Sequence, residues 1–181
     1  MTPERKGWIA GVVFGGVVLI FLFWGLETAM RRESTGVGRF PDESHGSRSI
    51  DLVFPDQDDG FAVETREVLG AEFLEDEVRR TVEELIRGST DGVHPLPEST
   101  RLLDVFFDGD GEIVLNFSDE LRKDHPGGSE AETATLRCLA GTLAANFPVV
   151  QRLRILIDGE APMTLAGHMD VTGAIEVEEY R

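Results

Sequence analysis

The feature that most limits how this chain can fold is an apolar run close to its N-terminus. Residues 8–26, WIAGVVFGGVVLIFLFWGL, contain no charged side chain over nineteen positions. As an α-helix this run would be about 28 Å long, which matches the hydrocarbon core of a bilayer. Trp8 and Trp24 lie near its two ends, where indole rings favour the membrane interface. The run therefore predicts one transmembrane helix, with the lipid bilayer as its partner.

A cleaved signal peptide is the alternative interpretation of this run. Its cleavage site requires two small residues, separated by one residue of any type, just after the apolar segment. The corresponding residues here are Glu27, Thr28 and Ala29, so a carboxylate stands where a small side chain is required. We therefore expect an uncleaved anchor within residues 1–30, with the N-terminus in the cytoplasm and the C-terminal bulk of the chain outside.

Three glycines recur at every fourth residue near the start of this segment. Gly7, Gly11 and Gly15 would lie on one helix face, where small residues let a neighbouring helix backbone approach closely. The spacing predicts self-association of the membrane helix. The alternative is that these glycines have no special role, because glycine is common in membrane helices. A membrane-dimerisation reporter would lose its signal on Gly11→Leu under the first interpretation and keep it under the second.

A linker separates the anchor from a folded domain. Residues 31–49, RRESTGVGRFPDESHGSRS, combine Gly, Ser, Pro and mixed charges without an apolar period, which predicts a flexible tether. The domain is expected over residues 50–181, a length that can bury a core without metals or disulfides. The single cysteine, Cys138, is expected to be a small buried apolar side chain.

The net charge of the chain excludes one class of partner. It is −17, from 34 acidic and 17 basic residues, and no long stretch concentrates the basic ones. Binding to a phosphate backbone needs concentrated Lys and Arg. We therefore expect no nucleic-acid partner.

Strand-like and helix-like patterns alternate along the domain. Apolar alternation predicts strands, and apolar residues spaced three and four apart predict two amphipathic helices, the second opened by a capping box of Ser129 and Glu132. The expected elements are strands at 50–54 and 61–68, a helix at 74–87, strands at 101–107 and 112–118, a helix from 129 that ends before Pro148, and a strand at 151–159. This order predicts an α+β fold with two helices packed on one side of a small, largely antiparallel sheet.

The densest alternation of acids occurs in FFDGDGEIVLNFSDEL, residues 106–121. A calcium loop of the EF-hand type needs ligands at positions 1, 3 and 5, glycine at 6 and a carboxylate at 12, and no register of this segment provides them. Asp-Gly pairs between two strands are typical of a hairpin turn, because glycine adopts positive φ without steric cost. We therefore predict a hairpin turn, with no metal and no cofactor.

No catalytic residue is expected. Asp119 and Glu120 are the nearest candidates for a pair of catalytic carboxylates, but nothing around them indicates the apolar site that raises the pKa of a general acid. The GHMD segment at 167–170 has a weak binding character, because His168 beside Asp170 can form a hydrogen-bonded corner. The alternative is a loop contact that fixes the C-terminal tail.

In their order along the chain, these segments resemble the GerMN domain of sporulation and germination proteins. The resemblance rests on IDLVFPDQD, on the helix VRRTVEELIRGST, on VHPLPESTRLLDVFFDGDGEIVLNFSDEL, on ETATLRCLAGTLAANFPVVQRLRILIDGE and on TLAGHMDVTGAI, which together cover nearly all of residues 50–175. It implies a small, non-enzymatic extracytoplasmic domain similar to ring-building modules of bacterial envelope complexes. The germination proteins of this kind usually carry two such domains and are lipoproteins, whereas this sequence has one domain after a membrane segment.

The sequence therefore supports a protein of the bacterial cytoplasmic membrane whose single extracytoplasmic domain associates with envelope proteins or with itself. The strand RLRILID and the helix at 74–87 are the expected contact surfaces. The second hypothesis is a module that binds a cell-wall or small ligand through the loops around His94 and His168. A hydrolase is the third.

Overall fold

The structure is a computed structural model that describes residues 46–56 and 60–180. The predicted membrane helix, with Gly7, Gly11 and Gly15, and most of the predicted linker lie outside the described residues. Within the described ranges, no helix combines the length and the apolar character that crossing a membrane requires. Residues His45–Arg181 form one compact unit, and the description below concerns its described part.

The predicted order of strands and long helices is confirmed, and three short elements are added to it. The elements are β1 (Ser47–Pro55), β2 (Phe61–Leu69), α2 (Leu74–Ile86), β3 (Leu102–Phe107), β4 (Glu112–Phe117), α3 (Glu120–Lys123), α4 (Ser129–Asn146), β5 (Arg152–Ile157), β6 (Ile175–Glu176) and a final 3-10 turn, η1 (Val177–Tyr180). The short elements α3, β6 and η1 were not predicted. β1 begins at Ser47, slightly earlier than the predicted strand.

Within the described residues, the strands form two sheets, so the prediction of a single sheet is wrong. β1 and β2 form an antiparallel hairpin, and β3, β4, β5 and β6 form the second sheet in that order, with β4 and β5 parallel. The outer edge of β1 faces helix α4. The Asp51 backbone N–H donates to Asn146 Oδ1 at 2.9 Å, and the Val53 N–H donates to Thr142 Oγ1 at 3.0 Å. Side chains of a helix thus stand where a further strand would otherwise pair.

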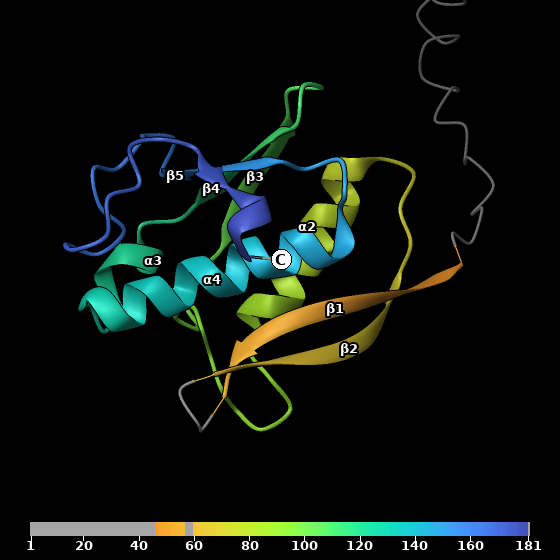
Figure 1. Cartoon of the computed structure of the whole chain (residues 1–181), viewed down its shortest axis with the longest axis horizontal. Helices are drawn as coiled ribbons and strands as arrows, with labels where there is room; N and C mark the ends of the chain where they lie inside the picture. Colours follow the sequence, from red (N-terminus) through yellow and green to blue (C-terminus); the bar gives the residue numbers. More distant parts are fainter. Residues whose placement is uncertain (1–45, 57–59, 181) are drawn as a thin grey trace, which may run out of the picture. The chain divides into compact units, whose positions relative to one another are not determined.

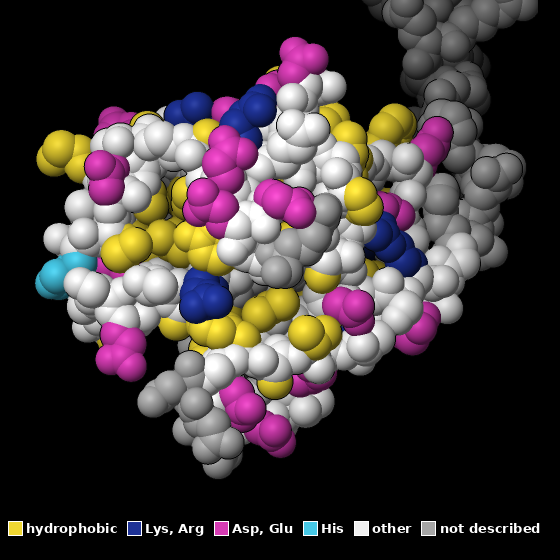
Figure 2. Space-filling model, viewed as in Figure 1, with side chains coloured by type: hydrophobic (Ala, Val, Ile, Leu, Met, Phe, Trp, Pro, Cys, Tyr) yellow, Lys and Arg dark blue, Asp and Glu magenta, His cyan; other side chains and the backbone are white. Residues whose placement is uncertain are grey.

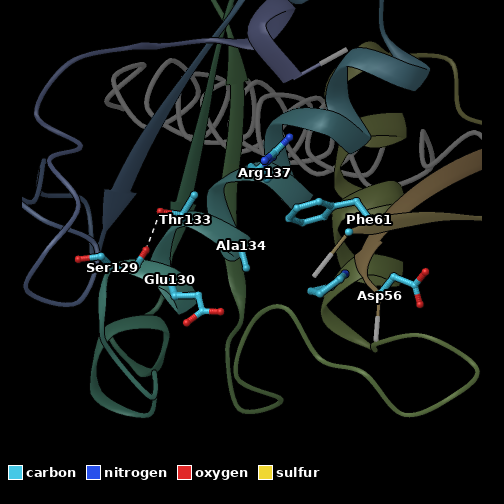
Figure 3. Close-up of a pocket in the computed structure, with 9 residues that line it drawn as sticks. Asp56, Phe61, Ser129, Glu130, Thr133, Ala134 and Arg137 are labelled. Atoms are coloured by element: carbon cyan, nitrogen blue, oxygen red, sulfur yellow. Dashed lines mark hydrogen bonds between the residues drawn. The ribbon is translucent and has the colours of Figure 1, made fainter. Parts of the chain in front are cut away.

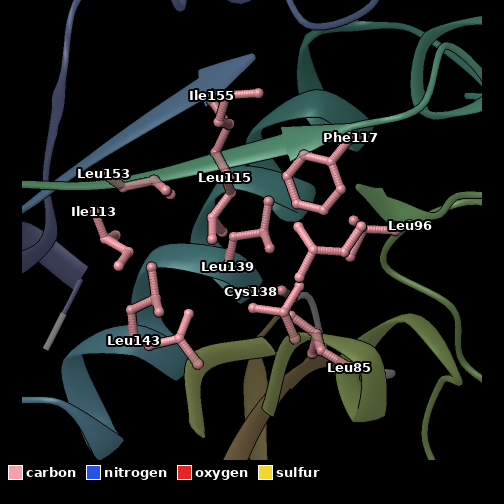
Figure 4. Close-up of a cluster of buried hydrophobic side chains, with 14 of the residues drawn as sticks. Leu85, Leu96, Ile113, Leu115, Phe117, Cys138, Leu139, Leu143, Leu153 and Ile155 are labelled. Atoms are coloured by element: carbon pink, nitrogen blue, oxygen red, sulfur yellow. The ribbon is translucent and has the colours of Figure 1, made fainter. Parts of the chain in front are cut away.

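The core lies on both sides of α4. Figure 1 shows the four-stranded sheet, the long helices and the β1–β2 hairpin as successive layers. Leu139 and Leu143 of α4 pack among inward side chains of β4 and β5, as Figure 4 shows, while Gly141 faces Val53 of β1. Every residue from Cys138 to Ala144 is buried. The predicted single apolar stripe of this helix is therefore only part of its buried surface.

The acidic turn between β3 and β4 is the predicted hairpin. Gly109 and Gly111 have φ of 85° and 97°, the left-handed region that glycine adopts freely. Asp108 Oδ1 accepts the backbone N–H groups of Asp110 at 2.7 Å and Glu112 at 2.9 Å. These hydrogen bonds close the turn, and they also lower the pKa of Asp108.

The predicted capping box at the start of α4 is wrong. Gly128 occupies the N-cap position, and no side chain of the described residues caps the helix there. Glu132 does not turn back toward Ser129. Its side chain is fully buried and accepts backbone N–H groups of the loop 166–169, far along the chain. The Ser-x-x-Glu spacing is present, but the Glu132 carboxylate binds the loop 166–169 instead of the N-terminus of its own helix.

Candidate functional site

Two adjoining hollows lie beside the N-terminal half of α4, and we call them together the α4 groove. They share Pro55 at the end of β1 and Ala134 of α4. The first has a volume of about 410 Å³ and is bounded by the hairpin on one side and by the first turns of α4 on the other (Figure 3). Figure 2 shows hydrophobic side chains gathered in the middle of the face that α4 crosses in Figure 1.

The first hollow is built from an aromatic ring, a guanidinium and small side chains. Arg137 of α4 lies over the ring of Phe61 at the start of β2, with its Cζ 4.7 Å from the ring centroid. The contact combines cation–π attraction with apolar cover of the arginine stem. Ser129, Thr133 and Ala134 line the helix side, where Thr133 Oγ1 donates to the Ser129 carbonyl at 2.6 Å.

The second hollow, of about 330 Å³, lies between α4 and two proline-containing loops. His94 lines it and pairs through Nε2 with Glu98 Oε1 at 3.2 Å. His125 also lines it and was not predicted as a site residue. Burial lowers the pKa of His125, which favours the neutral ring.

The hydrogen bonds of His125 give it a structural role. Its Nδ1 accepts the Gly127 N–H at 3.0 Å, so in the neutral ring Nε2 carries the proton and donates to Thr135 Oγ1 at 3.0 Å. The Thr135 hydroxyl in turn donates to the Pro95 carbonyl at 2.5 Å. This chain of hydrogen bonds joins α4 to both loops and fixes the walls of the hollow.

The GHMD segment is held by Glu132, which corresponds to the loop-contact interpretation. The Glu132 carboxylate accepts the N–H groups of Ala166 at 3.1 Å, His168 at 3.1 Å and Met169 at 2.8 Å. His168 Nδ1 lies 3.0 Å from Glu132 Oε1. Burial opposes ionisation of Glu132, but these hydrogen bonds outweigh it and lower its pKa to about 2.

The predicted pairing of His168 with Asp170 is replaced by two separate contacts. His168 contacts Glu132, whereas Asp170 Oδ1 accepts the N–H and the hydroxyl of Thr172 at 2.9 and 2.7 Å. His94 and His168 do not share a site either. The loop of His94 lines a hollow together with Ala131, Ala134 and Thr135, and the loop of His168 is held by Glu132 and Thr133 on another side of α4.

The groups that a catalytic reading would use are engaged in structural contacts. Asp119 pairs with Arg122 at 2.6 Å and with Lys123 at 2.7 Å, and its hydrogen bonds to these two side chains, that from Lys123 above all, lower its pKa. A general acid needs the opposite shift.

Burial raises the pKa of the Cys138 thiol to about 12, so it is not a nucleophile at neutral pH. Within residues 46–56 and 60–180, no group of three or more acidic, histidine or cysteine side chains is arranged to hold a metal ion.

The predicted contact surfaces have different positions in the fold. The strand RLRILID corresponds to β5, which pairs with β4 along its whole length and with the two-residue β6 only at Arg152 and Leu153. The helix at 74–87 corresponds to α2, whose apolar side, with Val78, Val82 and Leu85, is buried in the core. Neither α2 nor β5 contributes a residue to the lining of the α4 groove.

Comparison with known families identifies the domain. The family model called Germane, described as sporulation and spore germination, matches residues 51–162. The chain belongs to the Germane family. The GerMN-type resemblance of the sequence is therefore confirmed, and the match spans the hairpin, both long helices and most of the four-stranded sheet.

Solved structures share the Germane fold. The first GerMN domain of the sporulation protein GerM from Bacillus subtilis aligns with a TM-score of 0.59 at 18% identity, over 71% of this chain and 97% of that one. A candidate lipoprotein from Clostridium perfringens aligns with a TM-score of 0.54 at 23% identity, over 74% and 90%. The tandem GerMN domains of GerM give 0.54 at 14% identity, over 78% and 49%. Comparison with functionally curated proteins gave no match.

The Germane match ends before the loop that Glu132 holds. Residues 163–180 include this loop, β6 and η1, and they follow the matched range. They nevertheless close the core, because Leu165, Val171 and Val177 are buried. The Germane domain of this chain is thus completed by a C-terminal segment that is anchored on its central helix.

Proposed function

We propose that this chain is a membrane-anchored, extracytoplasmic protein–protein association domain of the bacterial cell envelope, without enzymatic activity. Its anchor is the uncharged run at residues 8–26. Its partners are envelope proteins or further copies of itself. Membership of the Germane family and the likeness to GerMN domains support a role in sporulation or germination.

The observation that carries this proposal is the α4 groove with Arg137 over Phe61. Protein interfaces depend on a few residues, among which aromatic side chains and arginine are enriched. Here both types stand at the edge of an open, largely apolar hollow, 4.7 Å apart. The hollow offers a partner side chain apolar cover from Pro55 and Ala134 and a cation at its rim.

Capture of partners from the native membrane tests the proposal. The full-length protein, cross-linked in cells and purified through a C-terminal tag, should retain specific envelope proteins, its own untagged copy included. Arg137→Gln should reduce that set at least several-fold. Arg87→Gln removes the same charge from an arginine with a 68% exposed side chain at the end of α2, and it should leave capture unchanged. Equal capture by both variants would refute the groove as the contact surface.

A ligand-binding module is the second candidate, and the hollow beside His94 and His125 favours it. Its volume of about 330 Å³ lies at the lower end of the range for small-molecule pockets. Soluble cell-wall fragments titrated against the protein test this candidate by calorimetry. Saturable binding that His94→Ala abolishes would support it, whereas an absence of heat alongside successful partner capture would leave the association function.

A further inference from the structure

One edge of the β1–β2 hairpin has most of its backbone groups open, although the Leu69 carbonyl at its end accepts a hydrogen bond from Arg80 Nη1 at 2.6 Å. The hydrogen bond from the Asp56 N–H to the Gly60 carbonyl, at 3.0 Å, sets the alternation of the ladder. Odd-numbered residues of β2 therefore direct their N–H and C=O groups away from β1. Among the described residues, no strand pairs with that side, because the sheet contains only β1 and β2.

The opposite edge of the hairpin is already closed by α4. Asn146 Oδ1 accepts the Asp51 N–H at 2.9 Å, and Asn146 Nδ2 donates to the Asp51 carbonyl at 2.7 Å. Thr142 Oγ1 accepts the Val53 N–H at 3.0 Å. The side chains of α4 thus imitate a neighbouring strand on one edge only. On the β2 edge, by contrast, no strand or helix side chain of the described residues pairs with the backbone of residues 61–67.

β2 lacks several of the features that normally protect an edge, although Glu64 and Arg66 are charged side chains turned toward the domain. Native edge strands are shortened, bulged or interrupted by proline or lysine. β2 has nine residues, FAVETREVL, with neither proline nor lysine, and it pairs with β1 without a register shift. Val63 is 62% exposed and Leu69 is 71% exposed. A long, regular strand with exposed apolar side chains is a strong template for pairing with another strand.

The sequence of β2 is complementary to itself when it is reversed. An antiparallel pair of β2 strands with its two-fold axis at Thr65 places Thr65 opposite Thr65, Val63 opposite Glu67, and Phe61 opposite Leu69. The same register places Glu64 of each copy opposite Arg66 of the other. Within each copy Arg66 already pairs with Glu64 at 2.7 Å and with Glu84 at 3.1 Å. Directly opposite side chains on one face are about 5 Å apart, so the dimer would join these ion pairs into one network of alternating charges. Residues 63, 65 and 67 then form the hydrogen-bonded pairs, as their open N–H and C=O groups require. The pair of Phe61 with Leu69 would in addition need the Leu69 carbonyl, which accepts Arg80 Nη1 in the single chain.

Neighbouring registers are less favourable. Moving the axis to position 64 places Glu64 opposite Glu64, and moving it to position 66 places Arg66 opposite Arg66. Like charges directly opposite each other destabilise a strand pair. An axis at position 67 likewise opposes two copies of Glu67, while an axis at 63 pairs fewer residues of the strand. Charge and length together therefore select the register centred on Thr65.

We propose that β2 pairs antiparallel with β2 of a second copy of this chain, about a two-fold axis at Thr65. The product is a four-stranded sheet in the order β1, β2, β2, β1, whose outer edges are both closed by α4 helices. A two-fold interface of this kind uses the same surface on both subunits and therefore stops at a dimer. The inference rests on the proposed association function and names one partner and one surface for it.

Cysteine cross-linking in the full-length protein tests the register. In this dimer the two Cα atoms at position 65 are about 5.5 Å apart, within disulfide range. The Cα atoms at position 67 of the two copies are about 14 Å apart, outside that range. Native membranes that carry Thr65→Cys should therefore yield a disulfide-linked dimer on mild oxidation, at least tenfold more than membranes that carry Glu67→Cys. The native Cys138 is buried and serves as an unreactive background.

Further variants complete the experiment. Val63→Cys and Glu67→Cys should each remain monomeric, and the double variant should cross-link because positions 63 and 67 oppose each other across the axis. Thr65→Lys, with two lysines facing each other at the axis, should abolish the cross-link in that double variant, whereas Thr65→Val should preserve it. Thermal melting of each purified variant verifies that it is folded.

The outcomes distinguish this inference from the broader function. Equal cross-linking at positions 65 and 67, which mere proximity of membrane helices would produce, refutes strand pairing. An unlinked Thr65→Cys variant that is folded refutes it as well. If partner capture still depends on Arg137 in that case, the proposed association function stands and only the β2 interface is lost.

Discussion

Glu132 offers the most quantitative prediction, because its buried carboxylate holds a loop through charge-assisted hydrogen bonds. The side chain is 0% exposed and accepts three backbone N–H groups at 2.8 to 3.1 Å. Its pKa falls from 4.5 to about 2 in the folded protein. At about 1.4 kcal/mol for each pKa unit, the charged form contributes roughly 3 kcal/mol to the free energy of unfolding.

The sign of the pH dependence follows from the direction of this shift. Between pH 4.5 and about 2, the unfolded chain binds a proton at Glu132 that the folded chain does not. The contribution is therefore complete above pH 4.5 and is lost as the pH falls toward 2. Linkage gives a loss of about 2 kcal/mol by pH 3.

Glu132→Gln should lower the free energy of unfolding at pH 7 by about 3 kcal/mol, because an amide cannot accept all three N–H groups and places its own N–H₂ against one of them. Urea unfolding of residues 45–181, followed by circular dichroism at pH 6 and pH 3, measures both effects. The decrease in the free energy of unfolding between pH 6 and pH 3 should be smaller in the variant by about 2 kcal/mol. Glu130→Gln, an exposed acid in the same helical turn, is the control and should change stability by less than about 0.5 kcal/mol. A Glu132→Gln variant that matches this control would refute the reasoning.

Three further predictions concern single contacts. Gly88→Ala should destabilise the domain by about 2 kcal/mol or more, because Gly88 has φ +83° and a Cβ there would meet the His94 ring at 2.5 Å; Gly173→Ala, with open space around it, should be nearly neutral in the same urea titration. Asn146→Ala removes both hydrogen bonds to the Asp51 backbone and should cost about 2 kcal/mol, with faster amide exchange at Asp51 than in the parent protein. Cys138 should fail to react with a disulfide reagent in the native protein and react fully in denaturant, and rapid native labelling would contradict its burial.

The sequence was sufficient to predict elements whose apolar period is long and regular. α2 illustrates this, because Val78, Val82 and Leu85 repeat at helical spacing and are buried as expected. The turn at Asp108 was also predictable, since the chemistry of Asp-Gly is local. α3 could not be predicted from period, because it has only four residues.

The arrangement of the sheets and the site residues depended on contacts between distant parts of the chain. Nothing local in β1 indicates that Thr142 and Asn146, about ninety residues later, would take its edge hydrogen bonds. Glu132 matched a capping pattern, and only the folded loop shows where its carboxylate binds. His125 carried a weak signal, a histidine followed by Pro-Gly-Gly before a helix, which is common to many turns. The α4 groove is lined by α4 and by segments that are far apart in the sequence, and residue spacing alone does not predict that they come together.

The burial of α4 on both sides has a consequence for which substitutions the domain can accept. A surface helix tolerates change on one face, so a deep mutational scan of α2 should show sensitivity at every third or fourth residue. Seven consecutive residues of α4, Cys138 to Ala144, are buried, and a Cβ added at Gly141 would come within 3.3 Å of Val53. The same scan should therefore find an unbroken block of intolerant positions in α4, with small residues kept wherever the hairpin presses on the helix. Divergent members that keep this fold would be expected to vary on α2 and at the loops well before they vary in that block.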